Sequence, residues 1–152
     1  MILVESADAM RELGAKIGSK LKAGDLISLI GPLGAGKTEL AKGIAQAFGI
    51  EEVTSPTFVI ARSYKSNPPL IHMDAYRLLA GANPLSELED LDLNSEEAVT
   101  IIEWGGELVE RISDQYLAVK IDREVNLESE TREVTFMGHG KRWEGFVEDL
   151  LK

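Results

Sequence analysis

A glycine-rich stretch near the start of the chain ends in a lysine and a threonine, residue types that can hold an anion and a metal ion. Gly31, Gly36, Lys37 and Thr38 fit the spacing G-x-x-x-x-G-K-[ST]. Glycines permit a tight turn whose backbone N–H groups point inward, and a helix that follows adds the positive end of its dipole. The lysine can then reach the β- and γ-phosphates of a nucleotide, and the threonine hydroxyl can hold Mg²⁺. The stretch therefore predicts a phosphate-binding loop, or P-loop.

Two elements must hold this loop in place. Residues 25–30 are almost entirely apolar, as in a strand covered on both faces, and residues 38–48 have the apolar periodicity of a helix that Gly49 ends. A buried strand before the loop and a helix after it are the context that the motif requires. The residues expected to line the nucleotide site here are Gly31, Leu33, Gly34, Ala35, Gly36, Lys37, Thr38 and Glu39.

Glu39 is unexpected in the first turn of this helix. A small hydroxyl residue at that position could hydrogen-bond the α-phosphate, whereas a carboxylate would repel it. We expect the Glu39 side chain to point outward, where the dipole of the helix N-terminus favours a negative charge.

Two acids stand at the ends of predicted strands further along the chain. Residues 99–104 form an apolar strand that delivers Glu103, the pattern of a Walker B acid directed toward Mg²⁺. Residues 70–74 read as a strand that ends in Asp74, with His72 on the same face. Asp74 could orient water, act as a general base or support the metal shell, or it could only cap the next turn. The sequence leaves open which acid positions the water.

A hydroxyl-rich segment around Pro56 precedes a predicted hairpin. It is either a capped turn into a strand or a switch segment in which Thr57 meets the γ-phosphate and Mg²⁺. Residues 57–64 and 70–74 have strand character and are separated by a Pro-containing turn, so we expect them to pair antiparallel.

The rest of the chain supplies flanking elements. We expect a strand at residues 1–5, a helix capped by Ser6, short helices near 85–93 and 107–112, and an antiparallel pair at 116–123 and 131–137. Residues 141–152 read as one closing helix. Its predicted apolar face consists of Trp143, Phe146, Val147, Leu150 and Leu151.

Composition limits the classes of function. A length of 152 residues indicates a single domain, residues 1–152, and the absence of cysteine excludes disulfides, thiolate metal sites and cysteine nucleophiles. No apolar run approaches the ~20 residues of a membrane span. The first residues lack the pattern of a signal peptide, so we expect a cytoplasmic protein. A net charge of −10 does not favour binding of RNA or DNA by this protein alone, although an acidic surface could dock on a basic protein.

The nucleotide and the reaction follow from what accompanies the P-loop. No N-K-x-D segment for reading guanine occurs in the sequence, so ATP is preferred. The arginines are scattered and no arginine-rich lid is visible, which favours hydrolysis over transfer to a metabolite. A small-molecule phosphotransferase and a non-enzymatic, nucleotide-dependent binding module are the alternatives.

Four blocks of sequence together resemble one family. Residues 33–38, the segment Ser55-Pro56-Thr57-Phe58, the segment His72-Met73-Asp74-Ala75-Tyr76-Arg77, and Ile102-Glu103-Trp104 occur in the order and spacing of the TsaE (YjeE) family. These proteins are P-loop ATPases of bacterial tRNA threonylcarbamoyladenosine (t6A) synthesis. The P-loop is common to many families, whereas the combination of the other three blocks is specific.

The resemblance implies an α/β fold: a three-layer P-loop NTPase domain with a mixed, mainly parallel sheet and antiparallel edge strands. It implies weak, Mg²⁺-dependent ATP hydrolysis, stimulated by the TsaB–TsaD complex, with tRNA contacted through those partners and no small-molecule substrate other than ATP. Lys37, Asp74 and Glu103 match catalytic positions, Thr38 and Glu103 match metal positions, and Thr57 matches the switch threonine. Pro32 and Glu39 depart from the family pattern.

Overall fold

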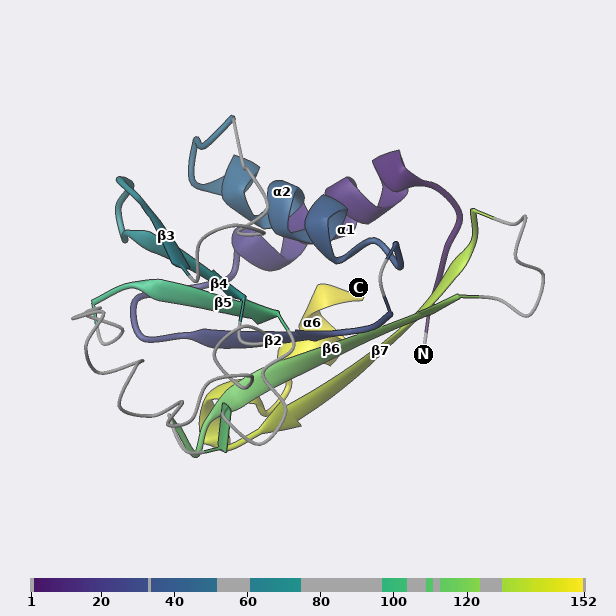
Figure 1. The fold of residues 1–152 in the computed structure, drawn as a ribbon. Helices are drawn as coiled ribbons and strands as arrows, with labels where there is room; N and C mark the ends of the chain where they lie inside the picture. Colours follow the sequence, from purple (N-terminus) through teal and green to yellow (C-terminus); the bar gives the residue numbers. More distant parts are fainter. Residues whose placement is uncertain are drawn as a thin grey trace, which may run out of the picture.

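The computed structural model describes residues 2–32, 34–51, 61–74, 97–103, 109–110, 113–123 and 130–151. Within these residues, seven strands form one sheet: β1 (Ile2–Val4), β2 (Leu26–Ile30), β3 (Ala61–Tyr64), β4 (Leu70–Asp74), β5 (Val99–Glu103), β6 (Tyr116–Arg123) and β7 (Arg132–His139). The helices are α1 (Ala7–Gly18), α2 (Lys37–Ala47), the 3₁₀ turn η1 (Lys141–Trp143) and α6 (Phe146–Leu150). Figure 1 shows α1 and α2 lying side by side over one face of the sheet.

The sheet is mixed, with the strand order β1-β7-β6-β2-β5-β4-β3. The central strands β6, β2, β5 and β4 run parallel, and antiparallel pairing is confined to the edges, where β7 joins β6 and β1, and β3 joins β4. The predicted α/β class, mixed sheet and antiparallel edges are confirmed. Because β2, β5 and β4 are parallel neighbours, their carboxyl ends meet at one edge of the sheet.

Both faces of the central strands are buried, as the largely apolar segment at residues 25–30 predicts. Ile27, Leu29 and Ile101 face α1 and α2 and belong to the main hydrophobic core. Ile71 and Ile102 alternate with side chains of that face and are also buried. The sheet is therefore an interior layer that holds the strand ends rigidly.

The local elements around the P-loop form where the sequence places them. The Ser6 Oγ accepts a hydrogen bond from the backbone N–H of Ala9 and caps α1, as predicted. Gly49 follows α2 with a φ of 79°, and the antiparallel pairing of β3 with β4 is confirmed. The predicted helix at 85–93 lies outside the described residues, as does the predicted helix at 107–112 except for residues 109–110.

The single closing helix predicted at 141–152 is wrong. Gly145 has a φ of 76°, a left-handed conformation that interrupts the segment between η1 and α6. Trp143, Phe146 and Leu150 are buried as predicted, but Leu151 is 47% exposed and does not belong to the packed face. Leu151 is the residue that follows α6, so it lies beyond the end of the helix face that the spacing predicts.

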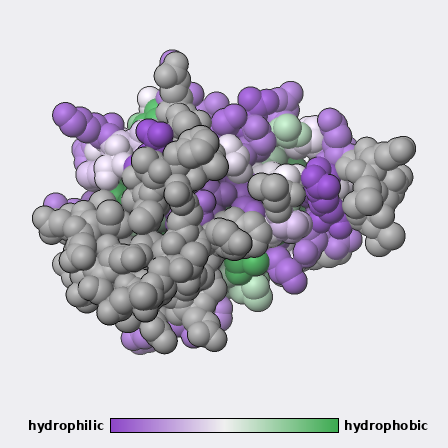
Figure 2. All heavy atoms as spheres, viewed as in Figure 1, coloured by the Kyte–Doolittle hydropathy of each residue, from purple (hydrophilic) through white to green (hydrophobic). Residues whose placement is uncertain are grey.

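The molecular surface agrees with the acidic, hydrophilic composition. Described side chains on the face shown in Figure 2 are mainly hydrophilic. The large hydrophobic side chains exposed among the described residues are Leu3, Met137 and Leu151. None of the helices in that part of the chain has the length and apolar character needed to cross a membrane.

A partly buried ion pair ties the C-terminal segment to the turn that leads into β2. The Arg142 guanidinium donates from Nε and Nη2 to the two carboxylate oxygens of Asp25, both at 2.8 Å, and from Nη2 to the Lys20 carbonyl. The Lys22 N–H donates to the same carboxylate. Asp25 is therefore fully engaged, and its charge depends on Arg142 for neutralisation.

We expect Arg142→Met to destabilise the fold by about 3 kcal/mol, because it leaves the Asp25 carboxylate buried and unpaired. Arg142→Lys should recover only part of this loss, since an ammonium cannot form the two parallel hydrogen bonds. Urea unfolding of each variant measures the effect. Lys141→Met, at the exposed neighbouring position, is the control. Equal stabilities of the Arg142→Met and Lys141→Met variants would show that the pair contributes nothing.

Candidate functional site

The loop between β2 and α2 forms the floor of the site. Gly36 immediately precedes α2 with a φ of 114°, a left-handed conformation that a side chain would strain. The Ala35 N–H donates to the Pro32 carbonyl, and the Leu40 N–H donates to the Gly36 carbonyl to begin the helix. The loop thus delivers the N-terminus of α2, the positive end of its helix dipole, to the carboxyl edge of the sheet.

Lys37, the first residue of α2, is only 6% exposed. Its Nζ donates to the carbonyls of Gly31, at 2.5 Å, and Pro32, at 3.3 Å. Burial lowers the pKa of the Lys37 ammonium, and the nearby charges of Glu103 and Asp74 oppose that shift. The structure therefore brings Lys37, Asp74 and Glu103 into one electrostatic neighbourhood, although the sequence separates them by 66 residues from first to last.

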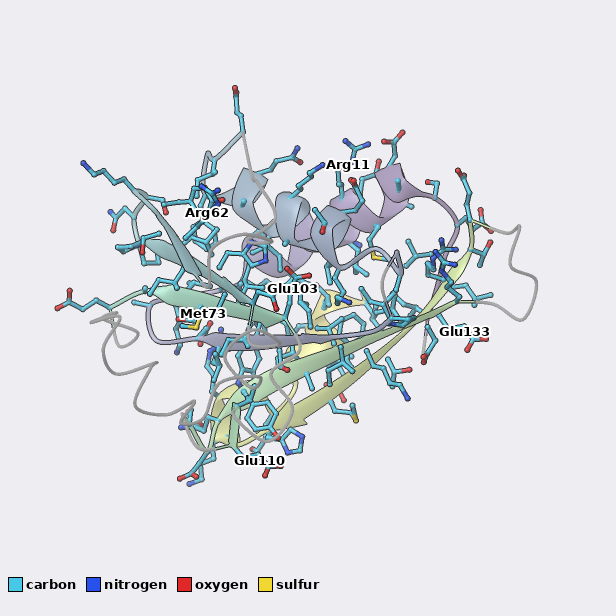
Figure 3. The ribbon with its side chains drawn as sticks, in the orientation of Figure 1. Arg11, Arg62, Met73, Glu103, Glu110 and Glu133 are labelled. Atoms are coloured by element: carbon cyan, nitrogen blue, oxygen red, sulfur yellow. The ribbon has the colours of Figure 1, made fainter. Side chains whose placement is uncertain are left out.

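The two acids lie side by side because β4 and β5 are parallel and Asp74 is in register with Glu103. Residues in register on neighbouring strands point to the same face. Glu103 is buried, and Figure 3 shows it on the α2 side of the sheet. Both carboxylates therefore end their strands at the edge that carries the P-loop.

A histidine that sequence reasoning left without a role touches one of these acids. The Nε2 of His72 lies 2.7 Å from the Oε2 of Glu103, and the two side chains are only 1% and 7% exposed. The sequence placed His72 on the face of Asp74, but the contact with Glu103 depends on the strand order. The one signal in the sequence was that Glu103 also ends a predicted strand. To use that signal, the pairing and register of the two strands must be known.

Two arginines from the β6–β7 hairpin also reach the P-loop. Arg123 Nη2 donates to the Gly34 carbonyl and Arg132 Nε to the Ala35 carbonyl, each at 3.2 Å. The two arginines are directly opposite each other across the hairpin. The interpretation of the arginines as scattered is therefore wrong for this pair, which the fold gathers at the loop.

Glu39 is held by two cations. Its carboxylate lies 3.3 Å from Arg11 Nε and 3.4 Å from Lys42 Nζ, and its side chain is partly exposed. It also lines a cavity of about 150 Å³ beside loop residues 34–36 and Arg132. The negative charge of Glu39 is thus balanced by Arg11 on α1 and Lys42 on α2.

The donor set at this edge is one of hard oxygen atoms. Thr38 supplies a hydroxyl in the first turn of α2, and Asp74 and Glu103 supply carboxylates. In the described part of the chain, no three histidine, aspartate or glutamate side chains gather as a metal site by themselves. One or two carboxylates completed by substrate phosphates are how Mg²⁺ is usually held, so these residues fit that ion. Leu33 and Thr57 lie outside the described residues.

Comparison with known proteins gives one consistent result. The family described as "Threonylcarbamoyl adenosine biosynthesis protein TsaE" matches residues 4–134. The tRNA threonylcarbamoyladenosine biosynthesis protein TsaE of Streptomyces coelicolor is 47% identical over 139 residues, which cover 88% of this chain and 93% of that protein. The TsaE proteins of Mycobacterium tuberculosis and Bacillus subtilis are 50% and 39% identical, over 73% and 86% of this chain and 71% and 80% of their own lengths.

The fold agrees with a solved structure. The crystal structure of Bacillus subtilis YdiB superposes with a TM-score of 0.78 at 29% identity, covering 99% of this chain and 92% of that one. The family match extends over the P-loop, Asp74 and Glu103, and the relatives resemble the chain over most of their lengths. This chain therefore belongs to the TsaE family.

Proposed function

We propose that this protein binds ATP with Mg²⁺ at the P-loop and hydrolyses it in support of t6A formation in tRNA. The observation that carries the proposal is the convergence of Lys37, Asp74 and Glu103 at the edge of the sheet where α2 begins. The family to which the chain belongs is named for threonylcarbamoyl adenosine biosynthesis. A phosphate loop with two acids beside it is suited to breaking the terminal phosphoanhydride bond.

The roles of the residues follow from their charges and positions. The loop N–H groups and the positive end of α2 bind the phosphates, and the Lys37 ammonium stabilises the negative charge that grows on them. Thr38 and Glu103 would hold Mg²⁺, which when bound neutralises phosphate oxygens. Asp74, in register with Glu103, is suited to orienting or deprotonating the attacking water. Gly31, Leu33, Gly34, Ala35, Gly36 and Glu39 would line the nucleotide site, and Thr57 would meet the γ-phosphate.

The partners are also part of the proposal. We propose that the protein acts in the cytoplasm with a TsaB–TsaD complex, that its hydrolysis supports repeated turnover of that complex, and that tRNA is contacted through the partners. The net charge of −10 supports this division, because phosphate-rich RNA is repelled by an acidic surface.

The decisive experiment compares ATP hydrolysis by the purified protein alone and after addition of the cognate TsaB–TsaD pair with tRNA. We expect slow hydrolysis alone, a clear rise with the partners, and more than one t6A product per complex only when ATP is hydrolysed. No binding to the pair and no change in rate would contradict the proposal. ADP released in step with a phosphorylated metabolite would instead identify a phosphotransferase.

Glu39 offers a prediction about nucleotide affinity. We expect Glu39→Thr to tighten ADP binding about fivefold, because it removes a negative charge near the phosphates and supplies a hydroxyl donor worth about 1 kcal/mol. Isothermal titration calorimetry measures the change. Arg11→Ala should act in the opposite direction, since it removes one of the cations that balance Glu39. Unchanged affinity in the Glu39→Thr variant would mean that the carboxylate does not influence the phosphates.

A further inference from the structure

The contact between His72 and Glu103 joins two buried side chains from neighbouring parallel strands. The Nε2–Oε2 distance of 2.7 Å is that of a strong hydrogen bond, and burial shields it from competition with water. His72 lies on β4 two residues before Asp74, on the same face, and Glu103 ends β5. The histidine therefore sits directly behind the pair of acids, away from the mouth of the site.

The imidazole has one polar contact in the described part of the chain. Its Nδ1 is buried and has no hydrogen-bond partner. A carboxylate can only accept, so Nε2 must carry the proton in this contact. The donor capacity of His72 is thus used on Glu103 alone.

A hydrogen bond to one carboxylate oxygen restricts how the whole group can turn. Oε2 is occupied by His72, so Oε1 is the Glu103 oxygen left for the P-loop side, where Lys37 lies within electrostatic reach. Supporting contacts of this kind orient ligand groups in metal sites, and their loss typically lowers metal affinity ~10–100-fold. A glutamate held only by its own flexible chain would adopt several rotamers.

We propose that His72 is a positioning residue that aims the free oxygen of Glu103 at the Mg²⁺–nucleotide position. This inference rests on the proposed function, since it concerns the same site. It assigns a role to a buried residue outside the P-loop and the two acids, and the role requires an N–H donor at the position of Nε2 rather than a charge.

Two amide variants separate the role from mere packing. In His72→Gln the amide nitrogen occupies about the position of Nε2 and can donate to Glu103. In His72→Asn it occupies about the position of Nδ1 and cannot reach the carboxylate. The two are equally polar, so they differ mainly in whether the contact to Glu103 is kept.

The readout is ADP binding measured by calorimetry as a function of Mg²⁺ concentration, together with kcat and KM for ATP. Mg²⁺ is expected to strengthen ADP binding, and we expect His72→Asn to raise about tenfold the Mg²⁺ concentration at which half of that strengthening is reached. The variant should also lower kcat for ATP more than it raises KM. Mg²⁺-free ADP binding should be unchanged, and His72→Gln should restore most of the Mg²⁺ response. In a Glu103→Gln background, His72→Asn should add little, because its target carboxylate is gone.

Other results would overturn the inference. A Mg²⁺ response in His72→Asn equal to that of the wild type would remove the positioning role, and an equal loss of Mg²⁺-free binding would assign His72 to general stability. Should His72→Asn fail to fold, His72→Leu repeats the test with an apolar side chain of similar bulk. If the wild-type protein shows no Mg²⁺-dependent nucleotide binding or hydrolysis, the proposed function itself is wrong. That result would be seen before any variant is made.

Discussion

Replacement of Lys37 by methionine is expected to reduce ATP hydrolysis by about two to three orders of magnitude, a typical loss when one preorganised charge-stabilising donor is removed. The ammonium is buried where the P-loop, α2 and the two acids meet, and it is the P-loop cation positioned for the β- and γ-phosphates. Methionine keeps the length and apolar stem of the side chain and removes only the charge and its donors.

The same substitution should leave the chain folded. Burial lowers the pKa of Lys37 below its usual 10.5, so the charged form is less favourable in the folded than in the unfolded chain. Loss of the hydrogen bonds to Gly31 and Pro32 acts in the other direction, and we expect a net change within about 1 kcal/mol. The activity loss is therefore one of chemistry and binding rather than of structure.

The pH dependence gives a second check on Lys37. Between the lowered pKa and 10.5 the unfolded chain binds more protons than the folded chain, so this group makes stability rise with pH in that alkaline window. The methionine variant lacks that rise. The difference in unfolding free energy between wild type and variant should therefore shift in favour of the wild type as the pH approaches 10.5.

Steady-state hydrolysis and thermal unfolding measure both effects. Lys42→Met is the matched control, because Lys42 is a more exposed lysine on the same helix that contacts Glu39. It should retain activity within a few fold. Hydrolysis in Lys37→Met at more than about a tenth of the wild-type rate would contradict the role given to the P-loop lysine.

The parts of this site that sequence could predict are those with local causes. The N-cap at Ser6, the helix that starts at Lys37 and the strand that ends in Glu103 each depend on residues within a few positions. The P-loop motif adds its own context, since it functions only between a strand and a helix. The observed bounds of these elements lie within one or two residues of the predicted ones.

The contacts that sequence could not supply are set by strand order. His72 and Glu103 are 31 residues apart, and they meet only because β4 lies beside β5 in a particular register. Arg123 and Arg132 reach the P-loop because β6 pairs with β2, a choice that no local pattern reveals. Periodicity gives the face of a strand, whereas the neighbour across the sheet is a property of the whole fold.

Replacement of Gly43 by alanine is expected to destabilise the fold by about 3 kcal/mol, equivalent to a fall of roughly 6–12 °C in Tm. A Cβ at Gly43 would overlap the carbonyl oxygen of Arg11 and lie 2.9 Å from the Arg11 Cα. The obstacle is backbone, which cannot rotate away as a side chain can. Alanine favours an isolated helix by about 1 kcal/mol over glycine, so the expected loss is a net effect in which packing outweighs helix propensity.

The close approach of α1 and α2 involves a glycine on each helix, so a second substitution tests the same contact. A Cβ at Gly14 of α1 would overlap the Leu40 carbonyl oxygen and lie 2.9 Å from the Cα of Gly43. Gly14→Ala should therefore cost a similar amount. Gln46→Ala, on an exposed position of α2, is the control and should stay within about 0.5 kcal/mol of the wild type.

The double variant distinguishes close packing from two independent defects. Both single substitutions force α1 and α2 apart at the same crossing, so once the helices have separated for one Cβ, the second meets less resistance. We expect the Gly14→Ala, Gly43→Ala pair to cost less than the sum of the two single losses in urea unfolding, because sites in contact are not additive. A fully additive loss, or Gly43→Ala as stable as the wild type, would mean that the two helices can move apart without cost. Because Lys37 lies at the start of α2, the same separation should weaken ADP binding in the single variants that remain folded, whereas Gln46→Ala should bind normally.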